Sequence, residues 1–458
     1  MDYRFKYVKG QGRTVPIEVT VNGPFGNEGI EIALPAWRPG RYELGYFARN
    51  IRAFKVRDQE GRSLNAVKTA HSRWTVDGTP ESITISYDCH AGELNGGSCW
   101  WDHEQLYINP IQCAVRVIGK ESEPCSVILE IPQNWNVATG MEKISKQEFR
   151  VRDYDELVDS PFIASPDLKH GTFNMDGIDF HVWIQGECDP DMDRIIRDIK
   201  DYTRVQLDTM RSFPVNSFHY LVQIKPEKFY HGVEHLTSTV LVLGPGSELM
   251  TDDMYENLIG VASHELFHVW NVKSIRPEEM MPYDYDRENY CSLGLVYEGV
   301  TTYYGDLFLA RSGFFDLDGY LEQVNRRLQL HMNNPGRFNY SVLESSFDTW
   351  LDGYTPGIPG RKTSIYHEGC LLALCTDLLI RKGSDSQRSL DDVMRALYND
   401  FALKGQGFSY QDYIRLVVND DNDEARDFFK NVVDQPVSYH ERMDEILSLA
   451  GLTINSYP

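Results

Sequence analysis

The sequence predicts an α+β protein with about three domains, and three observations support this. The chain has 458 residues, and a domain takes roughly 150 residues. Hydrophobic and polar residues alternate in the first third, as is typical of β-strands. Beyond residue 250 the hydrophobic residues mostly follow the helical period. We therefore expect a β domain over residues 1–165, a mixed α/β domain over 166–312 and a helical lobe over 313–458.

The composition is that of a globular protein with an acidic surface. Hydrophobic residues make up 41% of the chain and charged residues 25%, so a sizeable core is expected. The 45 basic and 68 acidic side chains give a formal net charge of −23. This charge disfavours nucleic acid and anionic membranes as partners, because both bind through Lys and Arg. The charge alone does not identify a function.

Targeting and redox features favour a cytoplasmic location. No hydrophobic run approaches the ~20 residues that span a bilayer, and the N-terminal residues lack the apolar region of a secretory signal. The eight cysteines form no C-x-x-C pair. We expect them to be reduced and mostly buried.

The first 165 residues are predicted to form an antiparallel β-sandwich. Alternation is clear over residues 15–21, 83–87 and 127–131, and turn signals at 22–24 and 95–97 separate these strands. Nothing in this segment suggests catalysis.

The pattern changes near residue 165. Hydrophobic positions over 192–202 follow the helical period, and strands are expected at 218–225 and 240–243. Three later Ser-x-x-Asp/Glu pairs are typical of helix starts, and they begin at Ser389, Ser409 and Ser438.

The strongest motif is H-E-x-x-H at residues 264–268, which arises by chance in such a chain roughly 0.03 times. Residues 251–253 offer a helix start, and apolar positions 258, 262, 266 and 270 form one face of that helix. His264 and His268 then lie one turn apart on another face, where both imidazoles can bind one metal ion. Zinc suits two neutral nitrogens and a carboxylate, with a fourth position for water. The alternative is a pair of hydrogen-bonded helix histidines without a metal, with an exposed glutamate, Glu265, between them.

Glu298 is the favoured third ligand. It lies in a predicted helix that Ser292 can cap and that ends before Gly313. Gly294 and Gly299 each cost this helix about 1 kcal/mol relative to alanine, which indicates close packing against another element. The competing carboxylates at positions 278, 279, 284, 286 and 288 lie in a polar loop that contains proline.

Glu265 is predicted to be the general base. It points towards the open zinc position, takes a proton from the water that zinc activates, and passes it to the leaving amine. Motifs for other chemistries are missing: there is no G-x-S-x-G elbow, Walker loop or dinucleotide fingerprint, and no cysteine has an evident cationic setting.

Taken together, these residues resemble the glycyl aminopeptidase family of zinc peptidases. The resemblance rests on HELFHVWNVKSIRP at 264–277 and EGVTTYY at 298–304, with 29 residues between His268 and Glu298. LPAWRPGRY at 34–42 and SLDDVMR at 389–395 extend it over nearly the whole chain. The resemblance implies a thermolysin-like α/β zinc lobe and one zinc ion per chain.

The resemblance also implies a substrate-binding loop. HGVEH at 231–235 is similar to the family's G-G-x-E-H loop, in which the glutamate binds the free α-amine of the substrate. This implies that Gly232, Val233 and Glu234 bind substrate. A carboxylate beside a strand edge can hold an ammonium group while the peptide pairs with that edge. His231 replaces the first glycine of the family loop.

A catalytic tyrosine is the last implied residue. IYHEG at 365–369 resembles the Y-x-K-G signature, whose tyrosine donates a hydrogen bond to the oxyanion, and this implies that role for Tyr366. Glu368 stands in place of the family lysine, so the local charge network is expected to differ.

We therefore expect a zinc aminopeptidase that removes the N-terminal residue, by resemblance glycine or alanine, from peptides with a free N-terminus. One alternative is a thermolysin-like zinc endopeptidase, and a less favoured one is a non-catalytic peptide-binding protein. Family members often carry a C-terminal PDZ domain, and the sequence ends where that domain usually begins. The sequence indicates no oligomeric state.

Overall fold

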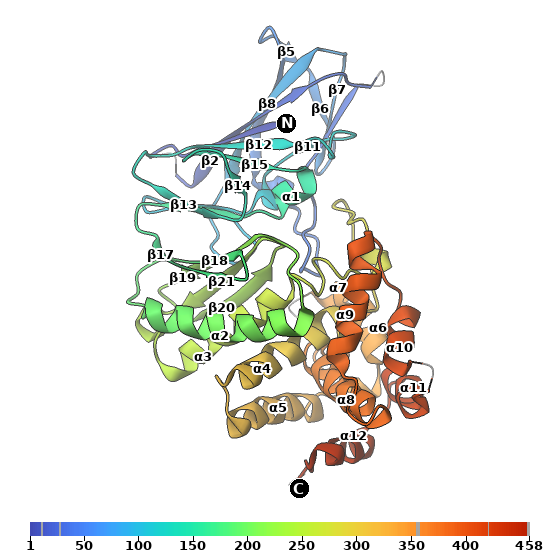
Figure 1. Cartoon of the computed structure of the whole chain (residues 1–458). Coiled ribbons are helices and arrows are strands. Elements are labelled where there is room, and N and C mark those ends of the chain that lie inside the picture. Colours follow the sequence, from blue (N-terminus) through green and yellow to red (C-terminus); the bar gives the residue numbers. More distant parts are fainter. Residues whose placement is uncertain (11, 27–28, 354–357, 420, 456–458) are drawn as a thin grey trace. The chain divides into compact units, whose positions relative to one another are not determined.

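The computed structural model describes residues 1–10, 12–26, 29–353, 358–419 and 421–455 (Figure 1). The chain divides into two compact units. Unit 1 contains Met1–Ile196, Val215–Leu258 and Tyr285–Arg287, and unit 2 contains Arg197–Pro214, Ile259–Asp284 and Glu288–Pro458. Each unit is described by itself.

Two of the sheets of unit 1 lie in its N-terminal part, which also contains the short helix α1 (Tyr154–Val158) (Figure 1). The larger sheet has the order β14-β15-β12-β1-β2-β8-β4-β5, and only its β1–β12 pair is parallel among the described pairings. The smaller sheet has the order β11-β3-β7-β6. In β2 and β8 alternate side chains are buried, as the hydrophobic alternation predicts. The bounds are β1 (Asp2–Lys6), β2 (Thr14–Asn22), β3 (Ile30–Ala33), β4 (Ile51–Asp58), β5 (Ser63–Leu64), β6 (Ala66–Ala70), β7 (Arg73–Val76), β8 (Ser82–His90), β11 (Arg116–Val117), β12 (Cys125–Glu130), β14 (Glu142–Lys143) and β15 (Glu148–Val151).

Two further sheets of unit 1 pack face to face. One has the order β13-β16-β10-β9, and the other is five-stranded with the order β17-β18-β19-β21-β20. Tyr107 and Ile163 of the first form one buried cluster with Leu221 and Val240 of the second. In the second sheet β18, β19 and β21 run parallel to one another. The two edge strands are antiparallel to their neighbours: β17 pairs with β18, and β20 pairs with β21. The bounds are β9 (Trp100–Trp101), β10 (Leu106–Ile108), β13 (Asn136–Thr139), β16 (Phe162–Ser165), β17 (Lys169–Met175), β18 (Ile178–Gln185), β19 (Ser217–Ile224), β20 (Phe229–Glu234) and β21 (Ser238–Gly244).

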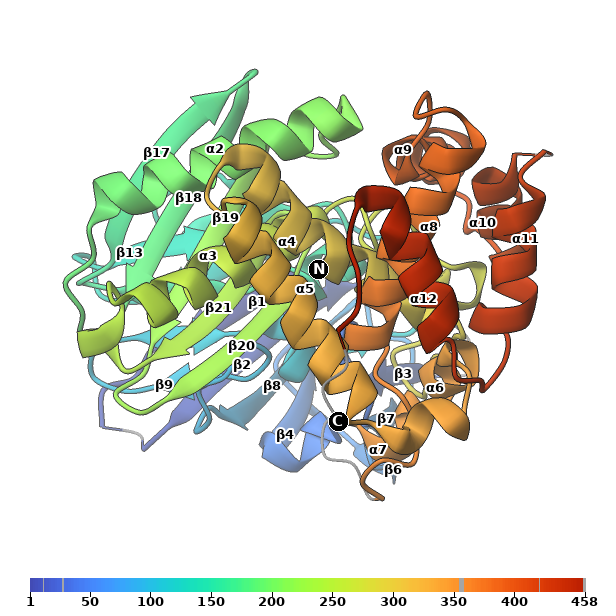
Figure 2. The same ribbon diagram turned by 90° about the horizontal axis from the view of Figure 1, so that it is seen from below.

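Unit 2 is mainly helical, and its central helix is α8 (His367–Gly383), which packs against α4, α5, α9 and α12 (Figure 2). Two long helices, α2 (Met192–Met210) and α3 (Asp252–Phe267), have residues in both units. A π-helical turn at Leu295–Val300 leads directly into α4. The remaining bounds are α4 (Thr301–Ser312), α5 (Leu317–Met332), α6 (Val342–Phe347), α7 (Thr349–Asp352), α9 (Leu390–Asp400), α10 (Tyr410–Val418), α11 (Asp423–Phe428) and α12 (His440–Leu447).

The helix starts test the predicted capping residues. Ser389 and Ser409 each begin a helix with a full capping box, as predicted. Ser438 does not, because α12 begins at His440 with Tyr439 at its N-cap and no side-chain hydrogen bond there. Ser292 is also wrong as a cap, since the helical segment begins at Leu295 with Gly294 at its N-cap. The predicted end before Gly313 is confirmed, because Gly313 takes the left-handed conformation that ends α4.

The predicted fold class is confirmed by the antiparallel-rich sheets of unit 1 and the helices of unit 2. The two compact units do not test the three-domain division, which stays a prediction. All eight cysteines are free of disulfides, and all but Cys188 are buried. Among the described helices, none combines the length and the apolar character that a membrane span requires.

Candidate metal centre

Helix α3 carries His264 and His268 on one face, in unit 2. Its start at Asp252 agrees with the predicted start near residue 251. The helix α4 approaches this face closely, because a Cβ added at Gly305 would lie only 3.2 Å from His264 Cβ. Ser263 fixes the approach further by donating a hydrogen bond to the Gly305 carbonyl at 3.0 Å. The position of His264 is therefore set by direct contact between two helices.

The structure brings His264, His268 and Glu298 together. Their ligand atoms all lie within 4.8 Å of one another, and this is the one such group of three among the described residues. The two Nε2 atoms are 3.1 Å apart. Glu298 Oε2 lies 3.7 Å from His264 Nε2 and 3.5 Å from His268 Nε2. Two imidazole nitrogens and one carboxylate are a donor set that suits zinc.

Glu298 reaches the histidines from the π-helical turn, and glycines make that position possible. A Cβ added at Gly299 would lie 2.5 Å from Gly369 Cα, and one at Gly369 would lie 2.7 Å from Gly299 Cα. The turn and α8 therefore cross backbone to backbone. Gly294 has a similar role, because its Cβ would lie 2.6 Å from Ser346 Oγ. The close packing predicted for Gly294 and Gly299 is confirmed.

Asn271 links the two ligand-bearing segments, and sequence reasoning did not identify it. Its carbonyl lies 2.7 Å from His268 Nδ1, which fixes the ring and leaves Nε2 towards the other ligands. Its side-chain amide donates to the Val296 carbonyl at 2.8 Å and to Thr301 Oγ1 at 2.9 Å. Asn271 thus joins the segment after α3 to the helix that carries Glu298. Its place three residues after His268 is the only sequence signal for this role.

The protonation states suit a metal ligand set. Burial lowers the pKa of His264, the contact with Glu298 opposes that shift, and the net pKa remains below its usual value. Burial acts to raise the pKa of Glu298, but the contacts with His264 and His268 lower it to about 2. A neutral imidazole and an ionised carboxylate are the forms that bind metal ions.

Tyr366 also lies at this group. It is half-buried at the N-cap of α8, and its hydroxyl donates to Glu298 Oε1 at 3.1 Å. Glu368, two residues further on, points into a different network: it lies 3.2 Å from His331 Nδ1 and accepts a hydrogen bond from Thr363. A buried histidine and a hydroxyl therefore satisfy the carboxylate that replaces the family lysine.

Glu265 follows His264 on α3 and is 5% exposed. The alternative with an exposed glutamate between two histidines therefore does not describe this helix. A buried carboxylate next to the half-buried His264 and the buried His268 is unusual in a purely structural helix, because charged side chains are rarely fully buried.

The predicted substrate-binding residues Gly232, Val233 and Glu234 lie in unit 1, on the edge strand β20. Glu234 is 8% exposed. A Cβ at Gly40, whose φ is +72°, would lie 2.5 Å from Glu234 Oε1, so only glycine leaves room for the carboxylate. Asp159 holds the following turn by accepting from the Leu236 amide at 2.9 Å. The sequence showed no link between the 34–42 segment and Glu234.

Comparisons with known proteins agree with this architecture. The chain matches the model of the peptidase M61 N-terminal domain over residues 2–166 and that of the M61 glycyl aminopeptidase over residues 257–372. None of the curated proteins compared with the sequence matches it significantly.

Solved structures extend the comparison over almost the whole chain. An aminopeptidase N family protein from Idiomarina loihiensis has a TM-score of 0.90 and 27% identity, over 98% of this chain and 78% of that one. An M1 zinc metallopeptidase mutant from Deinococcus radiodurans, bound to a Tyr-Ser-Ala substrate, has a TM-score of 0.57 and 15% identity, over 95% of this chain and 94% of that one. The second likeness shows the fold alone.

The fold and these matches define the class of protein as a metallopeptidase. Two domain models of one family match the N-terminal β part and the segment that holds the histidines and Glu298. The chain belongs to the M61 glycyl aminopeptidase family.

Proposed function

We propose that this protein is a zinc-dependent aminopeptidase that removes the N-terminal residue of peptides. The observation that carries the proposal is the group of His264, His268 and Glu298, whose ligand atoms lie within 4.8 Å of one another, with His268 and Glu298 buried and His264 half-buried. The donor set fits zinc, since it combines two imidazole nitrogens with a carboxylate that its neighbours keep ionised. One zinc ion per chain is part of the proposal.

These three residues would hold the ion. When bound, zinc would act as a Lewis acid on the scissile carbonyl and would make a water molecule acidic near neutral pH. The Asn271 carbonyl, 2.7 Å from His268 Nδ1, would keep the His268 ring in one orientation. A hydrogen bond at the ring nitrogen that does not bind the metal helps to maintain metal affinity.

Glu265 and Tyr366 would carry out the proton transfer and charge stabilisation. Glu265 would take the proton from the attacking water and deliver it to the leaving amine. Its place directly after His264 on α3, with an exposure of only 5%, supports this role. The Tyr366 hydroxyl, 3.1 Å from Glu298 Oε1, would donate to the oxyanion of the tetrahedral intermediate, a contact that typically contributes about 3 kcal/mol.

Glu234 would make the enzyme an exopeptidase. Its carboxylate lies at the end of an edge strand, and a peptide that pairs with such an edge leaves its N-terminus at a defined position. The carboxylate would bind the α-ammonium group there. Glycine or alanine as the preferred first residue is supported by the family likeness, and a cytoplasmic location remains a prediction from the sequence.

Peptide hydrolysis by wild type, Glu265→Gln and Glu256→Gln tests the proposal. Glu256 lies earlier on the same helix, so its replacement is a matched control. We expect wild type and Glu256→Gln to release alanine from a free tripeptide, and Glu265→Gln to lose at least about a thousandfold in kcat with its zinc content unchanged. Equal rates in all three proteins would exclude the proposed base.

The same assay with N-acetylated peptides separates the exopeptidase from an endopeptidase. Acetylation removes the positive charge that Glu234 would bind, so hydrolysis should fall by at least about a hundredfold. Equal hydrolysis of free and acetylated peptides would assign endopeptidase activity instead. Inactive wild-type protein with a full complement of zinc would indicate a peptide-binding protein.

A further inference from the structure

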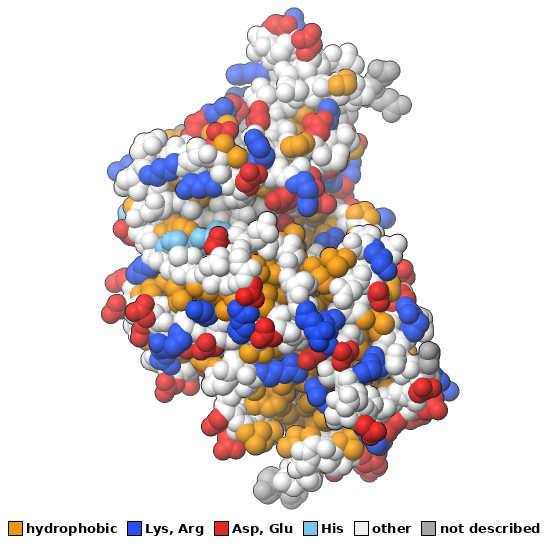
Figure 3. All heavy atoms as spheres, in the orientation of Figure 1, with side chains coloured by type: hydrophobic (Ala, Val, Ile, Leu, Met, Phe, Trp, Pro, Cys, Tyr) orange, Lys and Arg blue, Asp and Glu red, His pale blue; other side chains and the backbone are white. Residues whose placement is uncertain are grey.

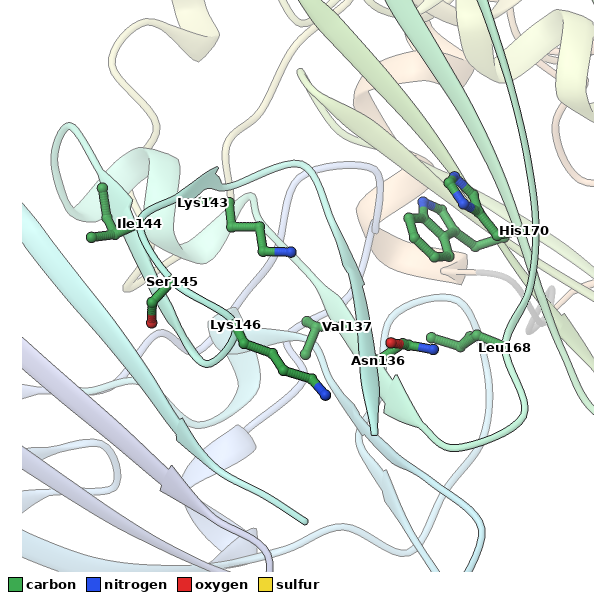
Figure 4. Close-up of a pocket in the computed structure, with 9 residues that line it drawn as sticks. Asn136, Val137, Lys143, Ile144, Ser145, Lys146, Leu168 and His170 are labelled. Carbon is green, nitrogen blue, oxygen red and sulfur yellow. The ribbon is translucent and has the colours of Figure 1, made fainter. Parts of the chain in front are cut away.

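A pocket lies in unit 1, at a place where three sheets end. It has a volume of about 630 Å³ and is lined by Asn136 and Val137, by residues 143–146, and by Leu168, His170 and Trp183 (Figure 4). Strands β13, β14 and β17 supply residues to it, and each is the edge strand of its own sheet. The pocket shares no residue with the candidate metal centre.

One wall of the pocket is a fixed aromatic surface. Trp183 and Leu168 pack against the buried cluster between the two facing sheets. The indole N–H of Trp183 donates to His219 Nδ1 at 3.2 Å. The His170 ring stacks on Trp183 with 3.6 Å between ring centroids and 8° between planes. These contacts hold both rings in place, so a flat ligand can stack without first ordering them.

The opposite wall is cationic. Lys143 and Lys146 extend from the 143–146 segment into the hollow, towards the side on which Leu168 and His170 lie (Figure 4). In Figure 3 histidines of this part of the surface are visible in pale blue beside an acidic side chain, and basic side chains lie above them. The lining contains no carboxylate. This is unusual in a chain with a net charge of −23.

Neither lysine has an acidic partner among the residues that the structure describes. Lys146 donates only to the Gln133 carbonyl. Other lysines of the chain pair with glutamates, as Lys120 does with Glu123 at 2.6 Å and Lys225 with Glu227 at 2.6 Å. Two ammonium groups beside a hollow without a carboxylate create a local positive potential that attracts anions.

We propose that this pocket binds a small organic anion that carries a flat ring. The ring would stack on the surface formed by Trp183 and His170, and the anionic group would lie between the ammonium groups of Lys143 and Lys146. A carboxylate and a phosphate both fit this description, because both accept hydrogen bonds from lysine. The neighbouring histidines His170, His181 and His219 do not form a metal site. Among the described residues, the ligand atoms of these three are not all within 4.8 Å of one another.

Binding to the full-length protein tests the proposal, measured by calorimetry or ligand-observed NMR at low salt. Four compounds separate the contributions: phenyl phosphate, benzoate, benzyl alcohol as a ring without charge, and inorganic phosphate as a charge without a ring. We expect at least one ring anion to bind with a Kd below about 1 mM, and benzyl alcohol and inorganic phosphate to bind at least about tenfold more weakly. The tighter of the two ring anions identifies the charged group that the pocket prefers.

Variants locate the binding. The double variant Lys143→Gln/Lys146→Gln should weaken binding at least about tenfold, and His170→Ala should weaken it several-fold. All three side chains are exposed, so the variants should still fold. Lys68→Gln is the matched control, since Lys68 also lies on an edge strand, with its ammonium group 5.2 Å from the Trp74 ring centre, and it should bind as wild type does. No binding of either ring anion at about 10 mM, or equal binding by the double lysine variant, would overturn the proposal.

Discussion

Replacement of Gly299 by alanine should destabilise the protein and weaken its metal site, although alanine favours helices. The added Cβ would lie 2.5 Å from Gly369 Cα, 2.6 Å from Gly369 C and 3.0 Å from its oxygen. Ordinary carbon contacts are about 3.5–4.0 Å, so the backbones must separate by about 1 Å. Overpacking of this kind costs about 3 kcal/mol at the upper end of its range. The helix propensity of alanine returns about 1 kcal/mol, which leaves a net loss of about 2 kcal/mol.

Gly260→Ala is a control for which we expect the free energy of unfolding to change in the opposite direction. Gly260 lies in α3, and nothing lies within 4 Å of a Cβ added there. The same substitution should therefore stabilise the protein by about 0.5–1 kcal/mol. Urea unfolding followed by circular dichroism measures both changes on the same apoprotein.

Metal affinity gives a second measure of the Gly299 substitution. Glu298 is the neighbouring residue, and metal–ligand distances tolerate deviations of only about 0.2 Å. A shift of about 1 Å should therefore lower zinc affinity at least about tenfold, measured by competition with a chelating dye, whereas Gly260→Ala should bind zinc as wild type does. A Gly299→Ala protein with wild-type stability and zinc affinity would refute the backbone crossing as the support of Glu298.

Three further predictions follow from buried contacts. Asn271→Ala should lower zinc affinity about 10–100-fold in the same dye assay, because it removes the bonds to Val296 and Thr301 that join the ligand-bearing segments. The pKa of His231 is lowered to about 4 by burial and by Arg38 and Arg41. Between about pH 6.5 and pH 4, His231 is therefore protonated in the unfolded chain but neutral in the folded protein. The free energy of unfolding should therefore fall as the pH drops from about 6.5 to about 4, by up to about 3 kcal/mol, and His231→Gln should remove that part of the decline in urea titrations. Glu368→Lys, which restores the family lysine, should lower the free energy of unfolding by about 3 kcal/mol, since it breaks the buried contacts with His331 and Thr363; an equally stable variant would show that this network is unimportant.

The part of the site that follows from local periodicity could be predicted from the sequence. His264 and His268 share a face because they are four residues apart on a helix, and the glycines beside Glu298 indicate the close packing that favours it as the third ligand. Both inferences use regularities of a single helix. The capping boxes at Ser389 and Ser409 are local in the same way, since each involves residues three apart.

The remaining features depend on contacts between distant segments. Asn271 contacts Val296 and Thr301, and Gly40 makes room for Glu234; neither pair has a sequence signal of its own. Ser438 carries the right residue pattern, but Tyr439 takes the N-cap position, and a cap depends on backbone angles that sequence does not specify. The pocket beside Trp183 joins three strand edges, so no single segment predicts it.

Release of the N-terminal residue from a free peptide and from its N-acetylated form, with zinc content measured on the same sample, tests the central proposal most directly. We expect about one zinc ion per chain, hydrolysis of the free peptide only, and loss of activity with a chelator, which added zinc reverses. Zinc-free protein with full activity, or equal hydrolysis of the two peptides, would contradict it.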